Sequence, residues 1–425
     1  MANTISKYLV CLAPFWMWIF DLFSTLFSIS HSEDSSAFTM SSIVTLIIVA
    51  VIYFWNLLKD RKLYNKELIF FVVVIVFFIL YMITGKRFWG STFALFYYMR
   101  KAVAYSLICM LSFYVIRREQ WMEALFHTTK WFAIIACCIV SVHMIPQLGL
   151  EWGAVVYYGT LRYQSMGYLC SNIISVLVVC LMLTNKNSAR LGYCVLIVAA
   201  IFSLLISGAR GAVLALFIAT GSVIALSVKV SSIPKILISL LIGVAVIVVV
   251  GSTIDINALF PDSFASRTFN YISDGSIDLD NRGDVFTLAI EYIERSPVFG
   301  YGIGSAYYYL GIYPHNLFLE LMFDGGIIYT VFITILLLYR IYYWIKCFRI
   351  HKEIRGTFAV IIVNIANSML SGSYYVTPWY YLIIFFDASY TPVIRNQIEQ
   401  SPNLYSDAIA GDELCQISED INDNN

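Results

Sequence analysis

Residues 191–228 read LGYCVLIVAAIFSLLISGARGAVLALFIATGSVIALSV, two apolar runs that meet at the short break SGARG at residues 207–211. Each run has about the length that a helix needs to cross the hydrocarbon core of a bilayer, roughly 17 to 25 residues. Both runs are continuously apolar rather than alternating, and a bilayer leaves the backbone of a lone strand unsatisfied. The stretch therefore predicts two membrane-spanning helices, with small residues and one arginine between them.

The whole chain has the same apolar character. Of its 425 residues, 60% are hydrophobic and 13% are charged, and the mean hydropathy is +0.77. Charged residues make up about a quarter of an average soluble domain, so this composition excludes a soluble enzyme, a disordered chain and a secreted disulfide module. Lysine and arginine balance aspartate and glutamate at 27 each, so nothing suggests a nucleic-acid partner. The sequence predicts an all-α polytopic membrane protein.

Residues 1–395 are predicted to form a single transmembrane domain of about twelve helices. The apolar stretches of spanning length lie at 8–28, 40–58, 67–84, 91–116, 131–147, 165–184, 191–207, 211–228, 235–253, 326–345, 357–373 and 378–394. One long connection, residues 254–325, separates the ninth stretch from the tenth. Residues 396–425 turn polar and acidic, which predicts a disordered tail.

The distribution of lysine and arginine predicts how the domain sits in the plasma (inner) membrane. The short segments after even-numbered stretches are rich in these residues, whereas the opposite short loops hold few of them. Because cytoplasmic loops carry the excess of positive charge, both termini and the tail are predicted to be cytoplasmic. The connection 254–325 then faces outward. Loops of this length are usually either functional or disordered, and its many aromatic residues disfavour disorder. We therefore expect it to fold over the outer ends of the helices.

Three polar elements fall on this outer side. They are SGARG at 207–211, DLDNRGD at 278–284 followed by SPVFGYGIG at 296–304, and YPHN at 313–316. Arg210 sits at the end of a span, where its planar guanidinium group can bind a phosphate. An equal alternative is that its side chain only extends to the membrane interface. His315 precedes an interface helix, where Asn316 could fix its tautomer.

Together these elements suit a reaction on an anionic, lipid-anchored diphosphate. Arg210 and Arg282 would neutralise the leaving group, and His315 would deprotonate an attacking hydroxyl. In the rival interpretation His315 donates a hydrogen bond to the diphosphate, and the base is Asp280, Asp284 or Glu320. Glu320 and Asp324 could instead orient His315 or simply lie at the interface. Tyr301 and its tyrosine neighbours fit a sugar-stacking surface, although tyrosine is also common at membrane interfaces. No CxxC pair or Cys/His zinc spacing occurs, so no zinc site is expected, and no cofactor is predicted.

The order of these motifs resembles the O-antigen ligase and polymerase family of integral membrane glycosyltransferases. The resemblance rests on ARG at 209–211, NR at 281–282, SPVFGYG at 296–302, HN at 315–316 and GG at 325–326. It implies an inverting, metal-independent transfer of glycans linked to polyprenyl diphosphate, at the outer face of the inner membrane. It also implies that Arg210 and Arg282 hold the lipid diphosphate and that His315 is essential, with Asn281, Asn316 and Tyr301 as substrate-binding candidates.

The predicted function is polymerisation of lipid-linked oligosaccharide repeats into O-antigen or a related surface polysaccharide, in lipopolysaccharide biosynthesis. The expected partners are the lipid-linked donor and acceptor, membrane lipid and a chain-length regulator. The first alternative is ligation of the glycan to lipid A core, but GIIY at 326–329 lacks a threonine that the ligase pattern has. A flippase or permease also fits twelve spans, although a transporter places its site near the bilayer midplane.

Ionisable residues within the predicted spans are further candidates, because such groups are costly in a bilayer and often functional. Asp21 lies in the first span, and Arg100 and Lys101 lie in the fourth. One interpretation is an Asp21–Arg100 pair that locks two helices together. The other is a second basic site, in which Arg100 binds the diphosphate of the acceptor.

Overall fold

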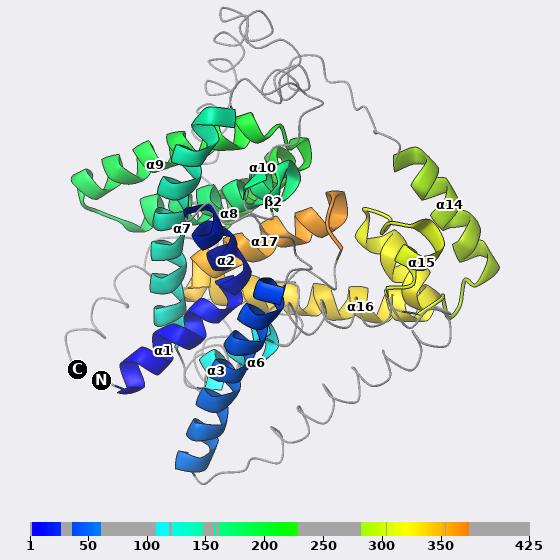
Figure 1. Cartoon of the computed structure of the whole chain (residues 1–425), viewed down its shortest axis with the longest axis horizontal. Coiled ribbons are helices and arrows are strands. Elements are labelled where there is room, and N and C mark those ends of the chain that lie inside the picture. The colour runs from blue at the N-terminus through cyan, green and yellow to red at the C-terminus, as the bar shows by residue number, and fades with distance from the viewer. Residues whose placement is uncertain are drawn as a thin grey trace, which may run out of the picture.

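The computed structural model describes residues 2–26, 36–60, 108–118, 121–147, 157–158, 161–227, 282–302, 304–352 and 354–373. These parts are almost entirely helical (Figure 1), which confirms the expected all-α membrane fold. Six helices of the described part are long and apolar enough to cross a membrane: Thr4–Ser24, Met122–Gln147, Tyr163–Leu183, Asn187–Ser207, Arg210–Ser227 and Leu317–Phe348. Shorter apolar helices, Met40–Trp55 and Ile354–Leu370, match the predicted spans 40–58 and 357–373.

The predicted count of twelve spans is not confirmed. The predicted spans 67–84, 235–253 and 378–394, and most of 91–116, lie outside the described residues. The predicted tail, 396–425, also lies outside them.

The first span is broken near its middle by a proline. Helix α1 (Ala2–Leu12) passes through a 3₁₀ turn, η1 (Ala13–Phe15), into α2 (Trp16–Leu26), with Pro14 in the turn. Proline removes a backbone donor and crowds the preceding turn, which explains the change of helix type. Phe15 and Trp18 then pack on Phe132 of α7 (Met122–Met144), with ring centroids 4.6 and 5.9 Å apart. A 3₁₀ turn, η3 (Ile145–Gln147), ends α7.

A second pair of helices joins this side of the bundle. Helix α3 (Ser36–Asp60) packs along α6 (Ile108–Arg118), where the rings of Tyr53 and Tyr114 lie 5.8 Å apart. The only strands in the described residues are β1 (Tyr157–Tyr158) and β2 (Leu161–Arg162), a two-residue antiparallel ladder just before α8.

Helix α8 (Tyr163–Leu183) forms the centre of the bundle and is the most buried of the six long helices. It packs against α9 (Asn187–Ser207), α10 (Arg210–Ser227) and α17 (Ile354–Leu370). The Asn364 amide donates to Asn172 Oδ1 at 3.1 Å, and Ser171 Oγ donates to the Ala212 carbonyl at 2.7 Å. Such bonds between helices satisfy polar groups that water cannot reach in a bilayer.

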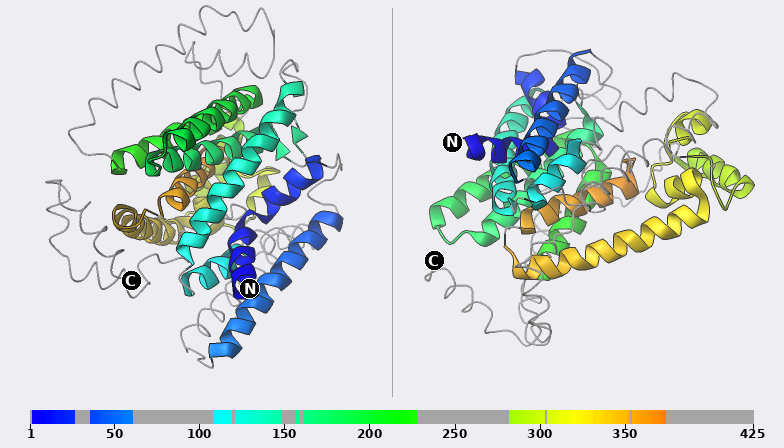
Figure 2. Two further views of the ribbon diagram at one scale, coloured as in Figure 1. Left: turned by 90° about the vertical axis from the view of Figure 1, so that its left-hand side faces the viewer. Right: turned by 90° about the horizontal axis from the view of Figure 1, so that it is seen from below.

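Helix α16 (Leu317–Ile350) is too long for one straight span and is kinked at Gly326, whose φ is 64° and ψ −166°. The kink coincides with the predicted start of the span 326–345. The part before the kink, together with α14 (Arg282–Arg295) and α15 (Ala306–Leu310), lies at one end of the bundle (Figures 1 and 2). A small apolar cluster, centred on Ala289, Ala306 and Phe323, holds these three helices together.

Candidate functional site

The SGARG break is a tight turn that glycine makes possible. Gly208 caps α9 with a φ of 66°, a left-handed conformation that costs glycine little. Its N–H donates to the Leu205 carbonyl at 3.1 Å, and α10 begins two residues later at Arg210. Arg210 is half-buried at the first residue of a helix, where the helix dipole favours anions, although its own N–H donates to the Gly208 carbonyl at 3.1 Å.

Two glycines, Gly167 of α8 and Gly211 at the end of the break, let the break lie close to its neighbours. A Cβ added at Gly167 of α8 would lie 2.3 Å from Ala209 Cβ, so the break and α8 touch with almost no space between them. A Cβ added at Gly211 would lie 2.6 Å from the Tyr168 hydroxyl and 3.2 Å from Ser371 Oγ. The start of α10 is thereby held against the beginning of α8 and the end of α17.

The YPHN segment reaches the same end of α17. Ser371, the first residue after α17, offers its carbonyl oxygen to two side chains of this segment. Tyr313 donates its hydroxyl at 2.6 Å, and Nδ1 of His315 lies 3.2 Å from the same oxygen. The rings of Tyr313 and His315 are 4.3 Å apart. Because the last carbonyls of a helix lack partners within it, these two donors satisfy a group that would otherwise be unpaired.

The contact with Ser371 assigns the tautomer of His315. A carbonyl can only accept, so Nδ1 carries the hydrogen when this bond forms, and the lone pair of the neutral ring lies on Nε2. His315 also has a φ of 54°, the only positive value of a non-glycine among the described residues. Such a conformation costs on the order of 1 kcal/mol or more and persists where the surroundings enforce it. The ring is thus held with an acceptor nitrogen on the side away from Ser371.

Asn316 has a different contact from the one expected. Its Oδ1 accepts from the backbone N–H groups of Phe318 at 3.0 Å and Leu319 at 3.2 Å, so it is the N-cap of α16. Asparagine is among the best N-cap residues because its short side chain reaches these donors. Nδ1 of His315 contacts Ser371 rather than Asn316, and Asn316 fixes where α16 begins. A substrate contact of Asn316 stays a prediction.

Residues 297–302, which we call the GYG loop, pack backbone to backbone on the kink of α16. A Cβ on Gly300 would lie 2.6 Å from the Phe323 carbonyl, and one on Gly326 would lie 2.3 Å from the carbonyl of Val298. Three backbone bonds join the two segments: Tyr301 N–H to Phe323 O at 2.8 Å, Gly302 N–H to Asp324 O at 2.7 Å, and Ile327 N–H to Pro297 O at 2.8 Å. These contacts explain why glycines recur in both motifs.

Tyr301 lies inside a small cluster of tyrosines. Its ring meets that of Tyr292 edge-on at 5.7 Å, and its hydroxyl donates to the Tyr292 carbonyl at 2.9 Å. Burial raises the pKa of Tyr309 in the same cluster, and the neighbouring tyrosines raise it further. These contacts give Tyr301 a packing role, and its contact with sugar stays a prediction.

Several predicted site residues cannot be placed. Arg282 is the first residue of α14, but its side chain lies outside the described part, as do Asn281, Asp280 and Arg100. Asp21 is fully buried in α2, and the choice between an Asp21–Arg100 pair and a second basic site at Arg100 stays open. The structure therefore brings together the elements of Arg210 and His315, while the position of the second arginine relative to them stays a prediction.

Two buried carboxyl groups follow His315 on α16. Glu320 is 0% exposed and accepts a hydrogen bond from Ser373 Oγ, whereas Asp324 is 1% exposed and accepts from the Gly304 N–H at 3.0 Å. By contrast, Asp284, another candidate base, is exposed in the first turn of α14. The serines after α17 were missed by sequence reasoning, because the span was predicted to run to residue 373, whereas α17 ends at Leu370.

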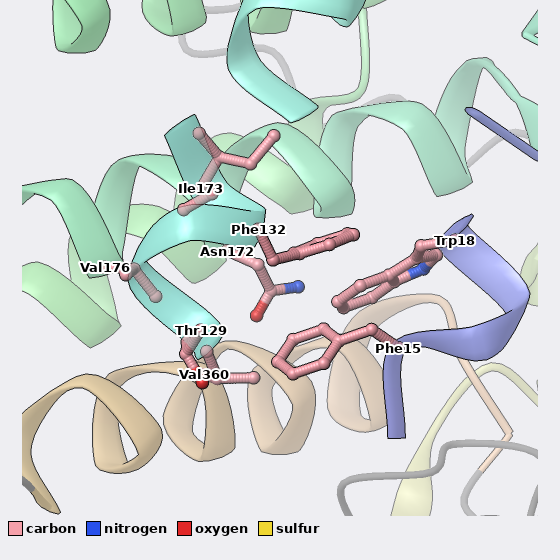
Figure 3. A pocket seen from close by; sticks show the side chains of 9 residues that line it. Phe15, Trp18, Thr129, Phe132, Asn172, Ile173, Val176 and Val360 are labelled. Carbon is pink, nitrogen blue, oxygen red and sulfur yellow. The ribbon is translucent and has the colours of Figure 1, made fainter. Parts of the chain in front are cut away.

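A cavity inside the bundle is distinct in character from this site. Figure 3 shows Asn172 beside the rings of Phe15, Trp18 and Phe132, with Thr129 and Val360 below. The cavity has about 10 Å³ of free space and almost wholly apolar walls. A single water needs roughly that much room, so a sugar or a diphosphate does not fit.

A comparison of the sequence with family models agrees with the motifs described above. Residues 195–334 match the family model described as O-antigen ligase, which confirms the resemblance predicted from the sequence. The matched region runs from α9 to the first part of α16 and contains both Arg210 and His315. No curated protein matches the chain significantly. Members of this family are membrane glycosyltransferase-like enzymes, ligases or polymerases.

Proposed function

We propose, from the match of residues 195–334 to the O-antigen ligase family, that this protein is a polysaccharide polymerase of the inner membrane. It joins oligosaccharide repeats carried on polyprenyl diphosphate, and it acts at the outer face of that membrane. The observation that carries the proposal is the position of Ser371. Its side chain lies at Gly211, next to Arg210, and its carbonyl lies at His315, so a candidate phosphate ligand and a candidate base approach one helix end.

The reaction assigns a separate task to each group. Arg210 and Arg282 bind the diphosphate of the donor, and the bond from the anomeric carbon to the diphosphate oxygen breaks, with its electron pair going to the diphosphate. A hydroxyl of the acceptor sugar attacks the opposite face of that carbon, which inverts its configuration. Nε2 of His315 takes the hydroxyl proton. The positive charges stabilise the leaving group where charge develops, and the base raises the nucleophilicity of a weak nucleophile.

The charge distribution supports an outward-facing site. The ends of α8, α9, α10, α16 and α17 that meet at Ser371 belong to one end of the bundle, whereas their opposite ends carry Lys186, Lys346 and Lys352. Cytoplasmic ends carry the excess of lysine and arginine. We propose, with the predicted spans outside the described residues, that both termini lie in the cytoplasm. The site would then receive lipid-linked repeats that have already crossed the membrane.

The second candidate is ligation of a finished glycan to lipid A core, which the description of the matched family favours. The same chemistry serves both reactions, since donor and leaving group are alike and only the acceptor differs. The absence of a threonine from GIIY at 326–329 favours the polymerase, because the ligase pattern has one there.

Gel analysis of the surface polysaccharide from a deletion strain distinguishes these functions. Loss of a polymerase leaves lipid A core that bears a single repeat. Loss of a ligase leaves bare core, and lipid-linked polymer accumulates. Bare core without any lipid-linked polymer outside the membrane would instead indicate a flippase, and would overturn the proposal.

A further inference from the structure

Glu320 connects α16 to the segment that orients His315. It lies five residues after His315, on the first turns of α16, and its N–H donates to the Asn316 carbonyl at 2.9 Å. Its side chain is fully buried, and Oε1 accepts the hydroxyl of Ser373, which is itself 1% exposed. A buried polar group is costly unless it is hydrogen-bonded, so this bond strongly favours one position of Ser373.

The segment 371–373 is held at both of its ends. The N–H groups of Ser371 and Gly372 donate to the Asn367 carbonyl at 2.8 and 2.7 Å, which closes α17. The Ser371 carbonyl then faces Tyr313 and His315, while Ser373 two residues later is bound by Glu320. The residues that contact Ser371 and Ser373, on either side of Gly372, lie at 313–320, just before α16 and in its first turn. A shift of Ser373 would therefore move the carbonyl that contacts His315.

We propose that Glu320 is a positioning residue, which fixes the tautomer of His315 by holding Ser373 and, through it, the Ser371 carbonyl. The catalytic meaning of this arrangement rests on the proposed function, but the arrangement itself does not. Glu320 is poorly suited to be the base, because no part of its side chain is exposed to an acceptor hydroxyl and one oxygen already accepts from Ser373. Without the carbonyl, the neutral ring would lose the acceptor that favours the hydrogen on Nδ1.

The tautomer can be measured without any enzyme assay. The chain has five histidines, so ¹⁵N spectra of histidine-labelled protein in nanodiscs can be assigned by comparison with His315→Gln. We expect wild-type His315 to show a protonated Nδ1 and an unprotonated Nε2 above the pH at which the ring gains its second proton. Ser373→Ala and Glu320→Ala should give a mixture of tautomers. Glu320→Gln should retain the wild-type pattern, because its amide oxygen can still accept from Ser373.

Asp324→Asn is the matched control, because Asp324 is an equally buried carboxyl one turn further along α16 that contacts Gly304 instead. It should leave the spectrum of His315 unchanged. If Glu320→Ala fails to insert, Ser373→Ala decides the question, since it removes only one hydroxyl. A wild-type tautomer in Ser373→Ala, or the same change in Asp324→Asn, would overturn the proposal.

Kinetics provide the second readout. Ser373→Ala should lower kcat about fivefold, the effect of losing one hydrogen bond, with little change in KM for the lipid-linked substrate. Glu320→Gln should stay within about twofold of wild type, and both variants should keep the acid limb of the pH profile. An inactive Glu320→Gln that has lost the acid limb would make Glu320 the base and overturn the positioning role. If wild-type protein transfers no sugar, the proposed function fails, while the tautomer measurement still tests the role of Glu320.

Discussion

Replacement of Gly326 by alanine should detach the GYG loop from α16. A Cβ at this position would lie 2.3 Å from the carbonyl carbon and oxygen of Val298, well inside ordinary contact, and neither backbone atom can rotate away. The loop must therefore move, which breaks the three backbone bonds between residues 297–302 and 323–327. At about 1 kcal/mol net for each bond, the loss is about 3 kcal/mol. This corresponds to about 100-fold faster hydrogen exchange of these amides.

Gly311→Ala is the control for an alanine at a positive φ that meets no neighbouring atom. Gly311 has a φ of 71°, close to the 64° of Gly326, but nothing lies within 4 Å of an added Cβ. A left-handed alanine at Gly311, where ψ is −12°, costs about 1–2 kcal/mol. At Gly326 the ψ of −166° lies in a region that is essentially limited to glycine, so alanine there adds backbone strain to the clash. Hydrogen exchange with mass spectrometry should show faster exchange at 297–302 and 323–327 in Gly326→Ala alone. Equal exchange in the two variants would refute the backbone contact.

Three further predictions concern the chemistry and the orientation. Arg210→Ala and Arg282→Ala should abolish polymer on polysaccharide gels while the protein still inserts, and lysine should restore it only in part, because it lacks the planar fork of arginine. If both alanine variants gave the wild-type distribution of chain lengths on the gel, these arginines would only contact the ends of their helices. Activity of purified protein should survive EDTA, and a loss that divalent cations restore would argue against a metal-independent transfer. A cysteine at Ser276 should react with an impermeant thiol reagent in intact spheroplasts, and labelling only after permeabilisation would invert the topology.

The sequence predicted well what depends on hydropathy and on glycine. The break at 207–211 and the start of the span at Gly326 are found where they were expected, because apolar runs and residues with positive φ are local features of the chain. Helix ends were less accurate. The span predicted at 131–147 begins at Met122, since residues such as Glu123 and Lys130 continue the helix without being apolar.

The assembly of the site could not be predicted from the sequence. Asn316 was expected to orient His315, since the two are neighbours, but its side chain caps α16, and Ser371, 56 residues away from His315, orients the ring. Likewise, Ser373 meets Glu320 across 53 residues. Contacts of this length depend on how α16 and α17 pack, which no local pattern in either helix specifies.

The most direct test of a glycosyl-transfer site with His315 as its base is a transfer assay. Purified protein in proteoliposomes receives polyprenyl-diphosphate-linked repeats, and the rate of chain extension is measured against pH for the wild type and for His315→Gln. We predict that the wild-type rate falls as the pH drops through the range in which histidine gains a proton, roughly pH 7 to 6. We also predict that His315→Gln is about 10²- to 10⁴-fold slower. Substantial turnover by His315→Gln, together with a rate that does not fall in acid, would contradict the account and move the base to a carboxylate.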